Sequence, residues 1–145
     1  MSVLHRTIYE KSVFVDTGPL YALFNKKDNN NQKALSCLES IRNHKLPIYV
    51  SNITIIETHK RLLFDLGYTK AIEFLVSIYG GSIPILRLTE QDETEAKRIL
   101  LKFSDQHFTL YDAINFSIMK RFGLSKAFSF DSHFKIFGFE KIPEL

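Results

Sequence analysis

Short apolar runs alternate along this chain with longer segments in which apolar residues recur every three or four positions. The runs are rich in Val, Ile and Phe, as buried parallel strands are, and they cover residues 12–16, 47–51, 83–88 and 126–131, with a fifth short run at 139–142. The periodic segments predict helices over about residues 18–25, 30–43, 53–66, 69–79, 90–103 and 110–122. Because strand and helix alternate, the pattern predicts an α/β fold with a central parallel sheet of four or five strands covered by helices on both faces.

The ends of the predicted helices carry the residues that commonly start and stop helices. Gly67 and Gly123 follow two helical segments, at the position where glycine ends a helix. The polar run 28–31 predicts a loop that enters the next helix. There is no internal repeat, low-complexity tract or Pro/Gly-rich linker, so we expect a single domain over residues 1–145.

Composition narrows the class of protein only moderately. Apolar residues make up 45% of the chain and charged residues 24%, which is ordinary for a globular protein. Cys37 is the one cysteine, so an internal disulfide is excluded and a reducing, cytoplasmic location is expected. No run approaches the roughly 20 apolar residues of a membrane helix, so we expect neither export nor membrane insertion. The net charge of +3 permits binding to a polyanion without requiring it.

Four acidic residues stand at junctions between predicted strands and helices. Asp16 and Asp131 end strand-like runs, Asp112 falls near the start of the last long helix, and Glu57 falls in the first turn of the helix after the second strand. In a parallel sheet these junctions share the carboxyl edge, where ligands of open α/β sheets bind. Carboxylates brought together repel each other, and oxygen ligands without cysteine select hard cations such as Mg²⁺ or Mn²⁺. The pattern therefore predicts a divalent-metal site.

The same acids also suit a purely structural role. The pattern Thr-x-x-acid is typical of a helix capping box, and it occurs at 54–57, at 109–112 and, away from the other acids, at 89–92. This motif alone does not distinguish a cap from a ligand. Asp16 and Asp131 differ because they follow buried apolar residues, where a lone carboxylate needs several hydrogen-bond donors or a cation. His133 lies near the predicted site, and its position favours packing or hydrogen bonding in a short turn over metal binding.

Four segments, in this order, resemble the PIN-domain ribonucleases, and most closely the VapC toxins of bacterial toxin-antitoxin modules. They are FVDTGPLYALF with Asp16 and Thr17, SNITIIET with Glu57, FTLYDA with Thr109 and Asp112, and FDSHF with Asp131, followed by Gly138 and Phe139. The resemblance covers nearly the whole chain. It implies a three-layer α/β/α sandwich. One departure is Asn31, where many relatives have a histidine; we expect this change to affect helix packing or the rim of the site more than the chemistry.

The resemblance also implies a mechanism. Asp16, Glu57, Asp112 and Asp131 would hold Mg²⁺ or Mn²⁺, with Asp16 and Asp112 as direct ligands and the other two binding a second ion or acting through water. Thr17 and Thr109 would support these carboxylates. The implied activity is endonucleolytic cleavage of RNA by metal-activated water, in a homodimer that an antitoxin inhibits.

Two alternatives stay open at this point. The first is a non-catalytic module that keeps the fold and binds RNA or a protein partner. The second is a PIN nuclease that acts in RNA processing and differs from a toxin only in its substrate. Four acids at one edge favour an enzyme over a binding module.

Overall fold

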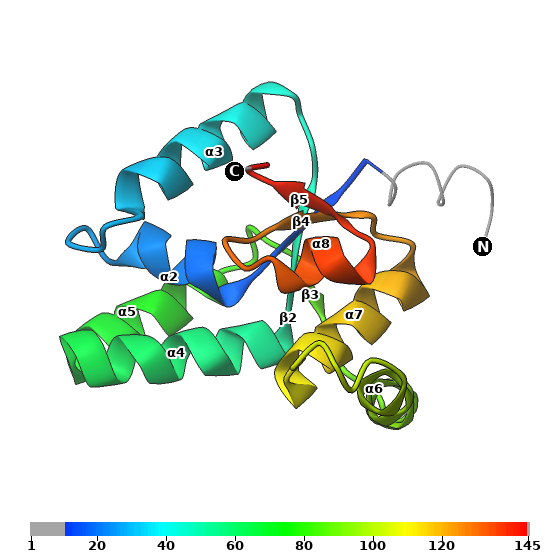
Figure 1. The fold of residues 1–145 in the computed structure, drawn as a ribbon. Coiled ribbons are helices and arrows are strands. Elements are labelled where there is room, and N and C mark those ends of the chain that lie inside the picture. Colours follow the sequence, from blue (N-terminus) through cyan, green and yellow to red (C-terminus); the bar gives the residue numbers. More distant parts are fainter. Residues whose placement is uncertain (1–10, 145) are drawn as a thin grey trace.

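A five-stranded, all-parallel sheet with strand order β3-β2-β1-β4-β5 forms the centre of the protein (Figure 1). The structure is a computed structural model that describes residues 11–144. The strands are β1 (Val13–Val15), β2 (Ile48–Ser51), β3 (Ile85–Leu86), β4 (Lys126–Phe128) and β5 (Glu140–Ile142). Because β1 lies in the middle and chain connections leave it in both directions, the crevice at its carboxyl end is the expected ligand position.

Seven helices are present within residues 11–144. They are α2 (Thr17–Phe24), α3 (Asn31–Asn43), α4 (Asn52–Leu66), α5 (Tyr68–Ile78), α6 (Glu90–Lys102), α7 (Leu110–Phe122) and α8 (His133–Phe137). The capping residues predicted from the sequence lie at the expected places: Gly67 ends α4, and Gly123 ends α7 with a left-handed backbone (φ 77°) that glycine adopts without strain.

Two hydrophobic cores separate the molecule into three layers. Alternate residues of β1 point to opposite faces, so Val13 and Val15 join the core that α2 to α5 cover, whereas Phe14 joins the core that α6 to α8 cover. Figure 1 shows these two groups of helices around the sheet. The predicted α/β/α sandwich with a parallel sheet is therefore confirmed.

Three details differ from the sequence prediction. The strand predicted at 83–88 is reduced to Ile85–Leu86. The strand predicted at 126–131 ends at Phe128, so Asp131 lies in the following loop and does not end the strand itself. The segment predicted as a turn at 132–134 begins the short helix α8 instead. Two of these differences shorten a predicted strand, and the third replaces a predicted turn with a helix.

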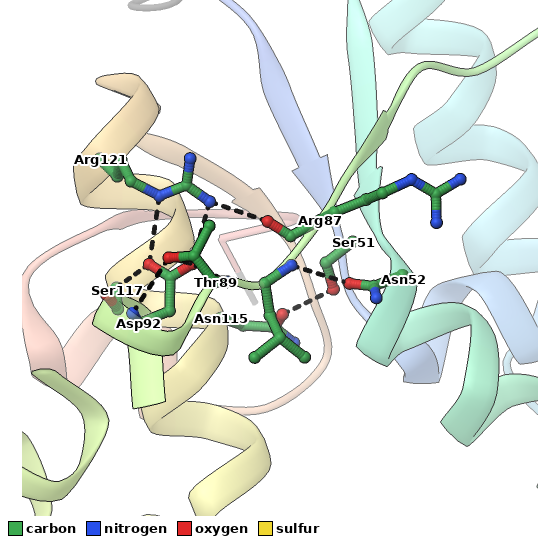
Figure 2. Close-up of polar contacts among 9 residues, drawn as sticks. Ser51, Asn52, Arg87, Thr89, Asp92, Asn115, Ser117 and Arg121 are labelled. Carbon is green, nitrogen blue, oxygen red and sulfur yellow. Dashed lines mark hydrogen bonds and ion pairs between the residues drawn. The ribbon is translucent and has the colours of Figure 1, made fainter. Parts of the chain in front are cut away.

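Helix α7 is anchored at two points, and both help to place the candidate site. At one point Ser51, at the end of β2, donates a hydrogen bond to Asn115 Oδ1 (2.7 Å). At the other, Ser117 Oγ donates to Asp92 Oδ1 of α6 (2.8 Å) (Figure 2). All residues from Asp112 to Met119 are buried. The start of α7 is consequently held by its neighbours on several sides.

Among residues 11–144, no helix has both the length and the apolar character needed to cross a membrane. Residues 1–10 and Leu145 lie outside the described residues. The prediction of a single domain over residues 1–145, and the expectation that the first residues carry no export or membrane segment, therefore stay predictions.

Candidate active site

A cleft of about 820 Å³ opens at the carboxyl edge of the sheet, and all four predicted acids line it. Asp16 comes from the junction of β1 and α2, Glu57 from α4, Asp112 from the first turn of α7, and Asp131 from the loop after β4. Segments more than 100 residues apart in the sequence thus meet at one place, as the parallel topology requires. Both predicted supporting residues, Thr17 and Thr109, also line the cleft.

Asp16 is buried, with 6% of its surface exposed, and two hydroxyl groups hold its carboxylate. Tyr111 donates to Oδ1 (2.7 Å) and Ser129 donates to Oδ2 (2.8 Å). Asp16 occupies the N-cap position of α2, yet its side chain makes no capping hydrogen bond there. Capping of α2 therefore does not account for Asp16, whose two carboxylate oxygens are held by side chains from α7 and from the loop after β4.

The charge of Asp16 is unfavourable in this setting. Burial raises the pKa of Asp16, the hydrogen bonds from Tyr111, Ser129 and the Thr17 backbone lower it in part, and the negative charge of Asp112 raises it further. A cation bound in the cleft would favour the ionised form.

The hydroxyl of Tyr111 is the centre of a hydrogen-bond network beneath the cleft. Besides donating to Asp16, it lies 2.7 Å from Thr17 Oγ1 and 3.0 Å from Thr54 Oγ1. Thr54 in turn contacts the Ser51 hydroxyl (3.1 Å) and accepts from Asn115 Nδ2 (3.2 Å). Burial, together with the charge of Asp16, raises the pKa of Tyr111 well above its ordinary value, so the phenol stays protonated and acts as a donor.

Asp112, Asp131 and His133 form the one group of three possible metal ligands found in residues 11–144. One donor atom from each lies within 4.8 Å of the others. His133 Nδ1 is 2.8 Å from Asp112 Oδ2 and 3.5 Å from Asp131 Oδ2, and the His133 backbone amide donates to Asp131 Oδ1 (2.9 Å). The sequence analysis favoured hydrogen bonding for His133, and the histidine does make these bonds; its place between two of the predicted acids was not foreseen.

Asp112 serves both as a helix cap and as a cleft residue. Its Oδ2 accepts the Thr109 backbone amide (2.9 Å), and Thr109 Oγ1 accepts the Asp112 amide (3.1 Å), so the predicted capping box is present. Its Oδ1 makes no hydrogen bond within the described residues. One oxygen of a carboxylate that is only 4% exposed thus remains available for a ligand.

The placement of Glu57 corrects one sequence prediction. Ser51, not Thr54, is the N-cap of α4, because the Ser51 hydroxyl accepts the Thr54 amide (3.1 Å). The predicted capping box at 54–57 is therefore wrong, and Glu57 lies in the second turn of α4 rather than the first. From there it lines the cleft without a hydrogen bond or ion pair to any described residue, outside the cluster of Asp112, Asp131 and His133.

Two residues that hold Asp16, Tyr111 and Ser129, were not predicted from the sequence, because they lie far from Asp16 along the chain. Arg61, which belongs to the basic group at 59–61 that could contact phosphates, lines the cleft on the same helix as Glu57. Adjacency to Asp112 was the only signal for Tyr111. Asn31, the noted departure from the resemblance, is buried and donates to the Ala22 carbonyl (2.7 Å), which is a contact between helices and not part of the cleft.

The chemistry of this donor set fits a hard divalent cation. Carboxylate oxygens dominate, and the unused oxygen of Asp112 and the half-exposed Asp131 face one cleft. Among the described residues, His133 is the one side chain with a basic nitrogen that contacts Asp112 and Asp131. A bound cation would relieve this repulsion.

The fold and the site together define a known family. The family model of the PIN domain matches residues 13–140, and the chain belongs to this family.

Two comparisons point to one group of relatives. The chain is 27% identical over 134 residues to the 23S rRNA-specific endonuclease VapC20 of Mycobacterium tuberculosis, and the match covers 91% of this chain and 99% of VapC20. The crystal structure of VapC20, described as a sarcin-ricin loop cleaving toxin, matches with a TM-score of 0.79 and 25% identity over 92% of this chain and 98% of that chain.

Two further structures share the fold at lower identity. FitAcB from Neisseria gonorrhoeae matches with a TM-score of 0.65, over 91% of this chain and 97% of that one. VapBC2 from Rickettsia felis, bound to a DNA fragment from its promoter, matches with a TM-score of 0.62, over 92% and 94%. Both are 15% identical to this chain, so they support the architecture alone.

Proposed function

We propose that this protein is a divalent-metal-dependent endoribonuclease that acts as the toxin of a toxin-antitoxin pair. The observation that carries the proposal is the cleft in which Asp112, Asp131 and His133 lie within 4.8 Å of one another, beside Asp16. The chain belongs to the PIN family and is similar over 91% of its length to an RNA endonuclease, and its cleft holds four acids of the type that such a reaction needs.

Asp16, Asp112 and Asp131 are the proposed ligands of Mg²⁺ or Mn²⁺, and Glu57 binds a second ion or acts through water. The closeness of Asp131 to Asp112 favours direct binding by both. When bound, such a cation supplies a water of lowered pKa and stabilises negative charge on phosphate oxygens.

The remaining residues orient these carboxylates. Tyr111 and Ser129 fix the two oxygens of Asp16, and Thr109 and His133 fix one oxygen of Asp112. Thr17 and Thr54 hold the phenol of Tyr111 in place. Orientation by buried partners lowers the cost of arranging the site for reaction, because less movement is needed when substrate arrives.

Further parts of the proposal concern partners and location. The similarity to VapC20, with the VapBC2 match as fold support, suggests an antitoxin partner encoded nearby, and we propose a homodimer in the cytoplasm. RNA is the proposed substrate class, with the sarcin-ricin loop of 23S rRNA as the first target to test because VapC20 bears that description.

The test is cleavage of an RNA hairpin carrying the sarcin-ricin loop, alongside a hairpin of altered loop sequence, by the purified protein with Mg²⁺ or Mn²⁺ and with EDTA. We expect metal-dependent cleavage, and we expect Asp16→Asn to slow it by about 100-fold or more, since a directly placed electrostatic group is lost. Asp105→Asn, an exposed carboxylate outside the cleft, is the matched control. If Asp16→Asn cuts as fast as wild type, the assigned site is wrong; binding without cleavage under either ion would favour the non-catalytic module.

A further inference from the structure

We propose that Arg61 is the residue with which the cleft binds a backbone phosphate of the RNA, next to the phosphate that is cleaved. This assignment rests on the proposed function and adds a substrate-binding residue to it. Arg61 lies on α4, one helical turn after Glu57, so the two side chains share a face of the helix. It is the one lysine or arginine among the described residues that line the cleft.

A tyrosine holds the guanidinium of Arg61 in place. The guanidinium carbon is 3.9 Å from the centre of the Tyr21 ring, which is a close cation-π contact. Tyr21 is itself buried (4% exposed) on α2, and its hydroxyl donates to Asp65 and accepts from Asn25 Nδ2 (2.9 Å). Arg61 therefore rests on a ring that is fixed by two further side chains.

The hydrogen-bond donors of Arg61 remain available. Within residues 11–144 its guanidinium makes no hydrogen bond and no ion pair, although five carboxylates line the same cleft. Two other arginines are engaged in ion pairs: Arg98 binds Glu95 (2.6 Å) and Arg121 binds Asp92 (2.9 Å). Because stacking uses the face of the guanidinium, the N–H groups in its plane stay free to meet a ligand.

A phosphate group fits these donors best. The planar fork of a guanidinium matches two phosphate oxygens, and such charge-assisted pairs are stronger than neutral hydrogen bonds. An RNA strand entering an acidic cleft meets repulsion from carboxylates at each phosphate that has no cation beside it. The metal ions proposed above would compensate for the cleaved phosphate, and Arg61, one turn further along α4, would compensate for an adjacent one.

The experiment measures RNA binding and cleavage separately. Binding of a labelled single-stranded RNA to the Asp112→Asn protein is followed by fluorescence anisotropy over a range of salt concentrations, with and without Arg61→Gln. We expect Arg61→Gln to raise Kd roughly tenfold and to reduce the slope of log K against log salt by about 0.7, the contribution of one contact to single-stranded nucleic acid. In the cleaving protein, Arg61→Gln should raise KM and leave kcat within about twofold.

Two further variants separate phosphate binding from other roles. Lys60→Gln removes the same charge from the adjacent position of α4, outside the cleft, and we expect it to change Kd by less than about twofold. Arg61→Lys should restore the salt slope but only part of the affinity, because an ammonium lacks the planar fork.

Distinct results would overturn this assignment. If Arg61→Gln and Lys60→Gln weaken binding equally, only general charge matters. If Arg61→Gln lowers the melting temperature and leaves Kd unchanged, Arg61 is a structural partner of Tyr21. An RNA that the protein binds through Arg61 but never cuts would refute the proposed function and leave the phosphate contact standing.

Discussion

Two capping boxes with the same sequence pattern start α6 and α7, and they have very different surroundings. In both, the threonine hydroxyl accepts the aspartate amide, and the aspartate Oδ2 accepts the threonine amide, at 2.8 Å in the pair Thr89–Asp92 and 2.9 Å in the pair Thr109–Asp112. Both aspartates are almost fully buried, with 1% and 4% of their surface exposed. Local sequence thus produces two nearly identical helix starts.

The two boxes differ in what else binds the carboxylate. Arg121 donates to both oxygens of Asp92, and Ser117 donates to Oδ1 (Figure 2). Burial opposes the charge of Asp92, but the hydrogen bonds from Arg121, the Thr89 backbone and Ser117 outweigh burial and lower its pKa. Asp112 has only His133 as a second partner and keeps Oδ1 free of hydrogen bonds within the described residues.

The partners beyond the capping box separate a satisfied carboxylate from one that is open to a ligand. Asp92 has a full set of protein donors and a neutralising arginine, so no ligand is needed to explain its charge. Asp112 is as deeply buried but incompletely satisfied, and Asp131 faces the same cleft. The second set of partners, and not the capping motif, decides the role.

Catalysis is the property that substitutions in the two boxes should change most. Asp112→Asn should reduce RNA cleavage by about 100-fold or more, because a carboxylate at the reacting phosphate is lost, whereas Asp92→Asn should leave the rate per folded molecule within about threefold. The measurement is kcat/KM on the hairpin substrate with the folded fraction checked by circular dichroism. Comparable losses in both variants would erase the functional contrast between the two boxes.

The second prediction concerns stability, and here Asp92→Asn should have a larger effect than Asp112→Asn. Asp92→Asn leaves the partly buried Arg121 without its counterion, which should cost about 2 kcal/mol of unfolding free energy, while Asp112→Asn should cost less than about 1 kcal/mol because repulsion from the neighbouring acids is also relieved. Urea denaturation followed by far-UV circular dichroism measures both values.

The pH dependence of the unfolding free energy tests whether the charge of Asp92 stabilises the protein. The pKa of Asp92 in the folded protein is lower than its ordinary value of 3.8. The ionised carboxylate therefore contributes its full stabilisation of the fold above pH 3.8, and this stabilisation is lost as the pH falls through the lower pKa of the folded state. The stability gap between wild type and Asp92→Asn should therefore shrink on acidification below about pH 4. A gap that stays constant down to pH 2 would show that the charge of Asp92 is not what stabilises the protein.

The smallest expected effect is the response to metal. Saturating Mn²⁺ should raise the melting temperature of wild type and of Asp92→Asn by roughly 3 °C, since a ligand of the native state stabilises it, and should raise that of Asp112→Asn by less than half as much. Thermal unfolding with Mn²⁺, with EDTA and with Ca²⁺ as a comparison ion checks this. Equal shifts in all three proteins would place the ion away from Asp112.

Much of this architecture was predictable from the sequence because its signals are local. Apolar runs specify the strands, helical periodicity specifies the helices, and parallel topology then brings Asp16, Asp112 and Asp131 to one edge. Glu57 was assigned to the wrong turn because Ser51 and Thr54 can both cap a helix, and the choice between them depends on where β2 ends.

The rest depends on contacts between distant segments. Tyr111 reaches Asp16 across 95 positions of sequence, and Arg61 rests on a ring from another helix. His133 reaches Asp112 only because residues 132–134 continue into a helix and not a turn. Partners of this kind have no periodic or motif signal, so they follow from the packing of the folded chain.

Helix α7 has nearly all of its first ten residues enclosed by neighbours, whereas Arg61 and Glu57 stand on an open face of α4. Substitutions on this face of α4 can therefore be made without disturbing the hydrophobic interior. Under the proposed phosphate contact, target choice is physically separated from the buried acids Asp16 and Asp112, although Glu57 shares its helix face with Arg61. A designer wishing to redirect the protein would therefore begin at Arg61, keep Glu57 and leave α7 untouched.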